Sequence, residues 1–412
     1  MKMLIKILII ILFVSKILFG IEIGGKIESL YSAGMENGKE YRRNLKLDLN
    51  LNQTFDETEF VGKIRFEEDT IRLREAERVY IREAYLSQDI FFNKYIESIN
   101  FKLGKIIYTW GNADELKPVD IINPQDLTYL LFKPLIERKY AVFSADFNLF
   151  ITSKLFYEFV AIPEFRKSEF DNSKIFVLKE LKSIPNYEEK IPDASVHNLN
   201  YASRIGAEIF NIDTHLIYYN GYDHIPVFSV QITNLNPLGI KATSIYKRIE
   251  MLGFDFQKAL FSGITIRGEI AYFYKGKFYN LKNSFDLKEK KNLEYTFGFD
   301  VVDLFIPNLY GNFQVNGRYI FDYKNEIEEK ENENSILGTL EYTFLRDKLK
   351  IKLRGFYNID DNAYALGEEF GIKVSQNYEI SFGSWIFEGD KETYYGQFRD
   401  NDFAYISANI IF

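Results

Sequence analysis

Two-residue alternation between apolar and polar side chains, repeated in long segments down to the last residue, is the feature that most constrains this chain. Leu293, Tyr295 and Phe297, for example, alternate with Glu294 and Thr296. Side chains two residues apart lie on the same face of an extended strand, so each such segment has one apolar and one polar face. A soluble antiparallel sandwich shows the same alternation, and the pattern therefore predicts strands without fixing their surroundings.

The length of the alternating segments favours a membrane. Most are longer than the roughly 5 to 6 residues of strands in globular sheets, and long enough to cross a bilayer when tilted. We expect eighteen strands, at about 21–31, 43–55, 58–68, 78–88, 97–108, 139–148, 151–161, 201–211, 213–221, 244–257, 263–275, 292–303, 310–323, 336–346, 348–359, 364–376, 378–388 and 402–412.

The connections between these segments alternate between short and long. The longest polar stretch is 162–200, and tight turns are expected near Asp56, Asn148, Asn211, Asp347 and Asn377. Short periplasmic turns and long extracellular loops are typical of outer-membrane barrels. The sequence therefore predicts an all-β protein, a closed antiparallel transmembrane β-barrel of about eighteen strands. Residues 225–243 leave room for another strand pair, so the expected range is 16 to 20 strands.

The first twenty residues have the composition of a secretion signal. Lys2 and Lys6 precede an apolar run from Ile7 to Phe19, broken only by Ser15 and Lys16. The run is too short for a spanning helix, and Gly20 is an acceptable last residue before cleavage. We therefore expect a signal peptide at 1–20 and one barrel domain at 21–412. Removing the three leader lysines changes the formal charge from −8 to −11, which argues against nucleic acid as a partner.

The C-terminal segment gives an independent indication of an outer-membrane address. Phe412, Ile410, Ala408 and Ile406 share one face of the last predicted strand. A terminal aromatic residue on an amphipathic last strand resembles the signal by which barrel-assembly machinery recognises its clients. We therefore predict that Phe412 is the assembly signal, and that the protein's partners are this machinery and the lipid of a Gram-negative outer membrane. The alternative is a chain that merely ends in a strand.

Catalytic and metal-binding patterns are missing from the sequence. It has no cysteine, and beyond the leader no run of about 18 apolar residues that would form a membrane helix. Its three histidines, His197, His215 and His224, stand in no G-x-S-x-G or H-E-x-x-H context. We therefore expect no enzyme activity, no cofactor and no metal site.

One long loop departs from the two-residue pattern. Between Trp110 and Pro134, Asn123-Pro124 indicates a turn, and Asp126 is a plausible N-cap for a short helix through Phe132. The apolar residues of this loop are too numerous for a freely solvated segment: Leu116, Val119, Ile121, Ile122, Leu127, Leu130, Leu131 and Phe132. We expect the loop to pack against the inner barrel wall. A lid, a subunit contact and a structural plug are the alternatives.

The same loop supplies a candidate site. We expect it to form the pore constriction through four acidic residues, Asp114, Glu115, Asp120 and Asp126. These would face basic residues of the pore wall and set a transverse field that selects solutes. The expected wall residues are Lys63, Arg65, Arg78, Arg82 and Lys102.

A resemblance to a known family appears around this loop. It is carried by Arg82-Glu83-Ala84-Tyr85-Leu86, Gly104-Lys105, Trp110-Gly111, Asp120, Asn123-Pro124, Asp126 and Ile162-Pro163. The arrangement resembles a family of bacterial outer-membrane barrels that is catalogued as a domain of unknown function and loosely grouped with porins. The match is specific over about 78–165, and Asn112 and Ala113 replace the basic residue usual after the W-G pair. The resemblance implies a barrel in the outer membrane.

The polar faces of the predicted strands point to a channel. They carry charges of both signs, which are costly to bury dry, and a barrel of 16 to 18 strands has room for an aqueous lumen. The sequence therefore predicts a porin-like channel for passive or weakly selective diffusion of small solutes. The alternatives are a ligand-specific channel or the outer component of an exporter, and a structural or adhesive surface barrel whose lumen is closed. A homo-oligomer stays open.

Overall fold

A computed structural model describes residues 20–70, 77–92, 95–128, 133–170, 187–235, 238–261, 263–282 and 286–412. Residues 1–19 of the expected signal peptide lie outside this part of the chain.

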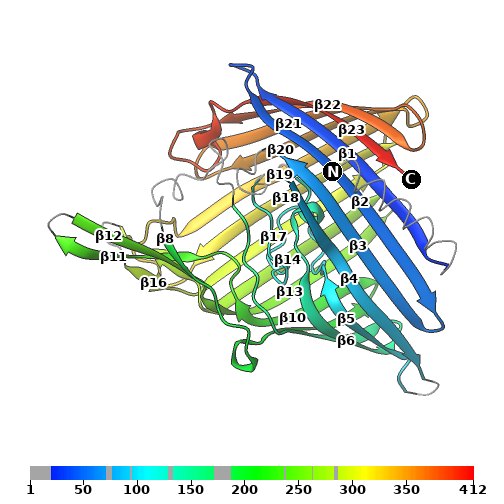
Figure 1. Ribbon diagram of the computed structural model, residues 1–412, viewed down its shortest axis with the longest axis horizontal. Helices are drawn as coiled ribbons and strands as arrows, with labels where there is room; N and C mark the ends of the chain where they lie inside the picture. Colours follow the sequence, from blue (N-terminus) through cyan, green and yellow to red (C-terminus); the bar gives the residue numbers. More distant parts are fainter. Residues whose placement is uncertain are drawn as a thin grey trace.

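Eighteen of the described strands form one closed antiparallel sheet (Figure 1). Strands that follow one another along this wall are hydrogen-bonded neighbours, and the first pairs with the last, with Lys26 opposite Ile411. The barrel strands are β1 (Glu22–Gly34), β2 (Glu40–Phe55), β3 (Thr58–Asp69), β4 (Glu77–Phe91), β5 (Ser98–Ile106), β6 (Val142–Thr152), β7 (Leu155–Ile162), β9 (Asn200–Ile209), β10 (Ile212–Tyr222), β13 (Arg248–Phe261), β14 (Ile264–Lys275), β17 (Asn292–Val302), β18 (Leu309–Ile320), β19 (Asn332–Phe344), β20 (Leu349–Asn358), β21 (Ala363–Lys373), β22 (Tyr378–Glu388) and β23 (Phe403–Ile411). The predicted fold class and strand number are confirmed, and every predicted segment overlaps one of these strands.

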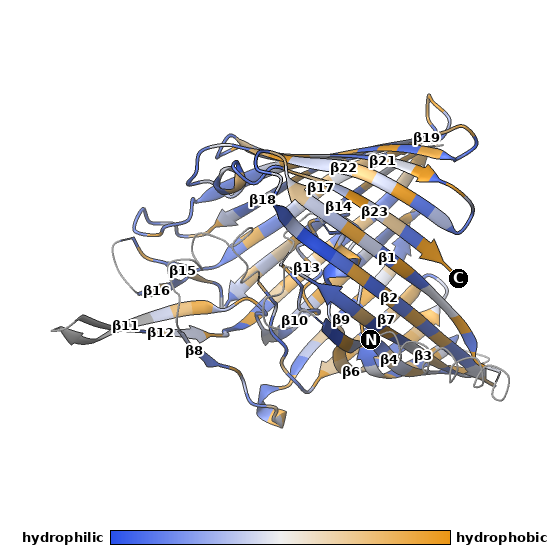
Figure 2. Cartoon of the chain, turned by 45° about the horizontal axis from the view of Figure 1, so that its top comes forward, coloured by the Kyte–Doolittle hydropathy of each residue, from blue (hydrophilic) through white to orange (hydrophobic). Residues whose placement is uncertain are grey.

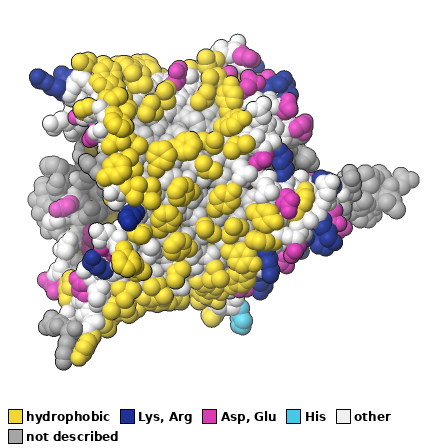
Figure 3. Space-filling view, turned by 180° about the vertical axis from the view of Figure 1, so that it is seen from behind, with side chains coloured by type: hydrophobic (Ala, Val, Ile, Leu, Met, Phe, Trp, Pro, Cys, Tyr) yellow, Lys and Arg dark blue, Asp and Glu magenta, His cyan; other side chains and the backbone are white. Residues whose placement is uncertain are grey.

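The alternation in the sequence becomes an outer and an inner surface. On β17 the side chains of Phe297 and Phe299 are 53% and 41% exposed, whereas those of Thr296 and Asp300 are buried. Figure 2 shows hydrophobic and hydrophilic residues alternating along the wall strands. Seen from behind, the outer surface is a broad hydrophobic band with most charged side chains towards its two edges (Figure 3). This is the surface that a hydrocarbon environment requires.

One end of the barrel carries the short turns. Asp56, Asn211 and Asp347 lie at turns with positive φ, and the turn near Asn377 is also present. The turn expected near Asn148 is wrong, because β6 continues to Thr152. Asn148 faces the lumen and donates a hydrogen bond to Asp146 at 2.8 Å, so this turn-forming residue type serves the inner face of a strand instead.

The other end carries the long loops, which contain additional strands. The strand pair suspected in 225–243 is present as β11 (Val227–Leu235) and β12 (Leu238–Ile245). It does not enlarge the barrel, because it forms a separate three-stranded sheet with β8 (Tyr187–Lys190) that projects from the loop end in Figure 1. The short strands β15 (Phe278–Asn280) and β16 (Leu287–Glu289) form a further pair.

Two segments fold inward from the loop end and create the buried core. The first is 107–141, which we call the lumen loop and which the structure describes at 107–128 and 133–141. Its apolar residues pack against inward side chains of β7, β10, β13 and β14, in a cluster of Ile106, Tyr108, Trp110, Val119, Ile122, Val142, Val160, Ile162, Ala202, Ile217, Tyr219, Ile249, Met251, Ala271 and Phe273. The second is 389–402, where Tyr395 and the following η2 (Gly396–Phe398) contribute Tyr395 and Phe398 to a cluster with Trp385 and Phe387 of β22. No described helix is long and apolar enough to cross a membrane.

Candidate functional site in the lumen

The lumen loop begins directly after β5 and is anchored on strands that face it across the lumen. The carboxylate of Glu269 on β14 accepts hydrogen bonds from the backbone N–H groups of Ala113 at 2.5 Å and Val119 at 3.5 Å. The guanidinium of Arg267 donates to the carbonyl of Asn112 at 2.7 Å. These contacts between side chains and backbone fix the path of the loop.

A glycine allows this close approach. Gly111 has a φ of +79°, and a Cβ atom at this position would lie 2.4 Å from Oε1 of Glu269. Next to it, the Trp110 side chain is buried, donates from Nε1 to Glu158 at 3.4 Å, and has the guanidinium of Arg204 5.1 Å from its ring centre. The Trp110-Gly111 pair is thus the point at which the loop turns against the wall, with the indole held on β7 and β9.

Glu115 connects the lumen loop to the far wall. Its carboxylate lies 2.8 Å from Nη2 of Arg354 on β20 and 3.3 Å from Nη2 of Arg138 at the end of α2 (Leu135–Arg138). Burial raises the pKa of Glu115, while the two guanidinium groups act in the opposite direction. The side chains of Glu115 and Arg354 are each 12% exposed, so this ion-pair cluster borders the solvent in the lumen.

The other three predicted acidic residues have different surroundings. Asp120 is fully buried and forms an ion pair with Lys139. Asp126 is also buried, accepts a hydrogen bond from the N–H of Thr128, and lies 3.6 Å from Nη2 of Arg78. Asp114 is partly exposed and lines a small cavity. The expected helix from Asp126 to Phe132 falls largely on residues 129–132, outside the described part, and the helix described in this loop is α2.

The predicted basic wall residues line the inner face of β3, β4 and β5. Arg78 meets Asp126, as expected, but Arg65 pairs with Asp48 at 2.6 Å and with Glu137 at 2.8 Å. Burial alone would raise the pKa of Glu137, but the charges of Arg65 and Arg82 lower this pKa to about 2. The sequence reasoning missed Glu137 as a partner of the wall.

A strand irregularity explains two of these positions. The register of β3 and β4 shifts after Lys63, which lies opposite Glu83, while Ile64 lies opposite Ile81, so Arg82 is the extra residue of a β-bulge. Arg82 donates to the carbonyl of Ile136 at 2.5 Å, and Lys63 forms an ion pair with Glu83.

Lys102, on β5, lies 3.9 Å from Asp146. All five wall residues therefore reach partners on the inner face, but only Arg78 reaches one of the four predicted acids.

Phe412 lies on the outer surface at the seam of the barrel. Its side chain is 52% exposed, and its backbone pairs with Gly25 through hydrogen bonds of 2.8 and 3.0 Å. This geometry closes the barrel, and the role of Phe412 as an assembly signal stays a prediction.

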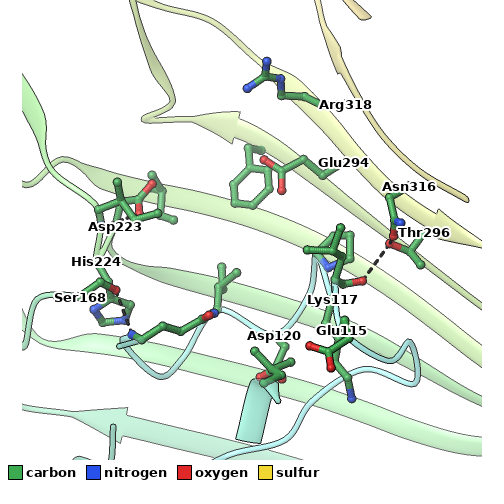
Figure 4. A pocket seen from close by; sticks show the side chains of 18 of the residues that line it. Glu115, Lys117, Asp120, Ser168, Asp223, His224, Glu294, Thr296, Asn316 and Arg318 are labelled. Carbon is green, nitrogen blue, oxygen red and sulfur yellow. Dashed lines mark hydrogen bonds between the residues drawn. The ribbon is translucent and has the colours of Figure 1, made fainter. Parts of the chain in front are cut away.

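A cavity of about 480 Å³ lies between the lumen loop and the loop-end half of the wall. Charged and polar side chains surround it: Glu115, Lys117, Asp120, Ser168, Asp223, His224, Glu294, Thr296, Asn316 and Arg318 are labelled in Figure 4. A second cavity of about 170 Å³ shares Glu115, Lys117, Asp120 and Leu135 with the first. Segment 115–120 therefore separates two spaces of the lumen.

Sequence reasoning could not have found several of these residues. Along the sequence, Glu269 is 156 residues from its partner Ala113, and Arg354 is 239 residues from its partner Glu115. Neither Glu269 nor Arg354 stands in a motif. Segment 389–402 gives no signal for infolding except its aromatic residues Tyr394, Tyr395 and Phe398.

Comparison with known proteins identifies a family and a fold. A family model described as "Protein of unknown function (DUF1302)" matches residues 28–305. No curated protein matches the sequence.

Among solved structures, OccK5 (OpdH) of Pseudomonas aeruginosa has a TM-score of 0.52 and 11% identity, covering 95% of this chain and 97% of that chain. OccAB3 of Acinetobacter baumannii has a TM-score of 0.51 and 8% identity, covering 95% and 99%. The outer membrane channel DcaP of Acinetobacter baumannii has a TM-score of 0.47 and 10% identity, covering 95% and 97%. The first two share the fold of this chain. A closed barrel of this fold with an apolar outer band is located in the outer membrane.

Proposed function

This chain belongs to the DUF1302 family of proteins of unknown function, and we propose that it is a porin-like channel through which small solutes diffuse with weak selectivity. The observation that carries this proposal is a polar, solvent-accessible lumen. Inward side chains keep part of their exposure inside the wall: 40% for Lys63, 34% for Lys102 and 34% for Lys352. A lumen filled by packed side chains would leave these ammonium groups without water.

The lumen loop supports a constriction in this channel. It crosses from β5 to anchors on β14 and β20, and its segment 115–120 separates the two cavities. Within this proposal Glu115 and Asp114 border the solute path, because they are partly exposed, whereas Asp120 and Asp126 hold the loop in place through buried contacts with Lys139 and Arg78.

Planar bilayers with the purified mature protein test the channel directly. We expect discrete conductance steps, and a larger single-channel conductance when the loop is shortened between Asn112 and Lys133. Circular dichroism and a shift in gel mobility on boiling would establish that both proteins are folded. A folded barrel without conductance would refute the proposal.

A surface-contact role is the second candidate, favoured by the separate sheet of β8, β11 and β12 at the loop end. Deleting 227–245 from this sheet separates the two functions. If the protein is a channel, the deletion variant should conduct as well as the parent. If the role is structural or adhesive, neither protein should conduct, and the deletion should abolish binding to a surface.

The remaining expectations belong to the same proposal. The leader at 1–20 directs export, barrel-assembly machinery recognises Phe412, and outer-membrane lipid covers the apolar band.

A further inference from the structure

The wall of the 480 Å³ cavity contains a regular grid of hydrogen-bonding side chains. On three adjacent strands, β17, β18 and β19, Glu294 lies opposite Arg318 and Arg318 opposite Glu333. One step further along the same faces, Thr296, Asn316 and Ser335 form a second row in the same register. All six line the cavity.

The charges of this cavity are already balanced within the protein. Arg318 forms an ion pair with Glu333 at 2.7 Å, and across the cavity Asp223 pairs with Lys277 at 2.9 Å. The lining contains five acidic and four basic side chains in total. A charged solute would have to compete with these internal pairs, so the cavity offers little net attraction to an ion.

Balanced pairs nevertheless keep hydrogen-bonding capacity. A carboxylate has more lone pairs, and a guanidinium more N–H groups, than one ion pair uses. In this grid the side chains of Arg318 and Glu333 are 26% and 38% exposed, so both offer polar atoms to the cavity. Asn316 is 6% exposed, and the hydroxyl oxygen of Thr296 lies 2.7 Å from its Oδ1 and 3.0 Å from the carbonyl oxygen of Leu116 on the lumen loop.

The lumen loop gives the cavity an apolar side. Leu116, Pro118 and Ile121 of the loop are half-buried and line the same space as the grid. In Figure 4 the loop residues around Lys117 and Glu115 lie below Glu294 and Thr296. The site therefore combines polar groups from both the wall and the loop with aliphatic groups of the loop. At about 480 Å³ its volume lies within the roughly 300–1,000 Å³ of small-molecule sites.

We propose that this cavity is a binding site for neutral polyhydroxylated solutes of the size of a mono- or disaccharide, which it holds on their way through the channel. The hydroxyl groups bond to the grid, where both donors and acceptors are available, and the C–H faces of the ring lie against the aliphatic loop residues. This inference rests on the proposed channel function for its physiological meaning, but the binding itself is measurable without conductance.

Two measurements on the full mature protein separate the binding site from the channel. Isothermal titration calorimetry in detergent, with glucose and sucrose as probes, should give saturable heats. In planar bilayers the same sugars should interrupt the single-channel current in a saturable way, and poly(ethylene glycol) of matched mass should only slow conduction without saturation. Binding without conductance overturns the channel proposal alone. Conductance without sugar binding overturns the inference alone.

Variants distinguish hydroxyl recognition from charge recognition. Arg318→Leu and Asn316→Ala each remove donors of the grid and should raise the half-saturating sugar concentration at least tenfold. Glu294→Gln removes a charge but keeps a hydrogen-bonding group, so binding should stay within about threefold. The matched control is Glu341→Gln, on the inner face of β19 outside the cavity, which should leave binding unchanged.

The inference is overturned if lysine or glutamate blocks the current where sugars do not. It is equally overturned if Glu294→Gln abolishes binding, or if neither Arg318→Leu nor Asn316→Ala affects it in a barrel that still shifts on boiling.

Discussion

Glu115→Gln is the substitution that best tests the lumen loop as the selective element of the channel. The change keeps the shape of the side chain and removes a carboxylate that lies 2.8 Å from Arg354 and 3.3 Å from Arg138. Asp120 and Asp126 are less suitable targets, because both are buried and their loss would disturb the fold of the loop.

The magnitude follows from the distances. A unit charge about 4 Å from a permeating ion contributes about 1 kcal/mol in water, with opposite signs for cations and anions. Removing the charge therefore changes the free-energy difference between a cation and an anion at this position by up to about 2 kcal/mol. Because about 1.4 kcal/mol corresponds to a factor of ten, we expect the cation-to-anion permeability ratio to fall about tenfold after screening. Arg138 is buried and exchanges a charged acceptor for a neutral amide oxygen, so the local stability of the loop should also fall.

The assay is the reversal potential in a KCl gradient near 0.1 M, where screening is moderate. Glu341→Gln is the matched control, since Glu341 lies on the lumen wall, where it pairs with Lys352 at 3.4 Å. Because burial raises the pKa of Glu115, this carboxylate should take up a proton at a higher pH than an ordinary glutamate does. The anion selectivity of the parent channel should therefore increase as the pH falls, and the Glu115→Gln variant should not show this increase. An unchanged ratio at normal conductance would show that Glu115 is not on the solute path.

The remaining predictions concern the wall, the loop anchor and assembly. Arg in place of the lipid-facing Leu340 should lower the free energy of unfolding by about 2 to 4 kcal/mol near the midplane, and Arg in place of the adjacent inward Thr339 should lower it much less. Urea unfolding in lipid vesicles measures both, and equal losses would contradict the assignment of faces. Glu269→Ala removes the acceptor of the loop N–H groups and should give a noisier, larger single-channel current, and a quiet, parent-like current would mean that the anchor is dispensable. Deleting Phe412 should lower the yield of heat-modifiable barrel in the outer membrane, and a normal yield would remove its role in assembly.

The barrel was predictable from the sequence because its determinants are local. Each strand repeats the same alternation, and a two-residue period assigns faces without knowledge of distant contacts. The errors occur where an inward contact overrides a local preference. Asn148, a frequent turn former, stays within β6 because it bonds to Asp146 on the inner face, and the bulge at Arg82 shifts the period of β4 by one residue.

The lumen was predictable only in part. The apolar content of the lumen loop correctly indicates packing against the wall, since eight large apolar side chains cannot stay solvated. The partners of its charges were not predictable, because they depend on the exact height and angle at which the loop crosses. Glu115 meets Arg354 from β20 and not Arg65, Arg78 or Arg82 from the strands next to the loop. Ion pairs across a lumen leave no periodic trace in the sequence.

Glu368 gives the last and most exacting test of the wall. It is exposed on the outer face at the middle of β21, between the lipid-facing Leu366 and Phe370, and its one described polar contact is the hydroxyl of Ser384, which donates at 3.0 Å. A carboxylate at the bilayer midplane costs less than the 2 to 4 kcal/mol of Arg or Lys there, so Glu368→Leu should raise the free energy of unfolding by about 1 to 2 kcal/mol.

The neighbouring Glu369 supplies the control, because it faces the lumen. It lies 3.4 Å from Lys350 and accepts the hydroxyl of Tyr405 at 2.8 Å, so Glu369→Leu should destabilise the barrel. Urea unfolding in vesicles should therefore give opposite signs for two adjacent glutamates. If Glu368→Leu also destabilises, its carboxylate must have a polar partner within the membrane beyond Ser384. A second copy of the barrel is then the first partner to seek, by cross-linking through a cysteine placed at Ser384 in a chain that has none of its own.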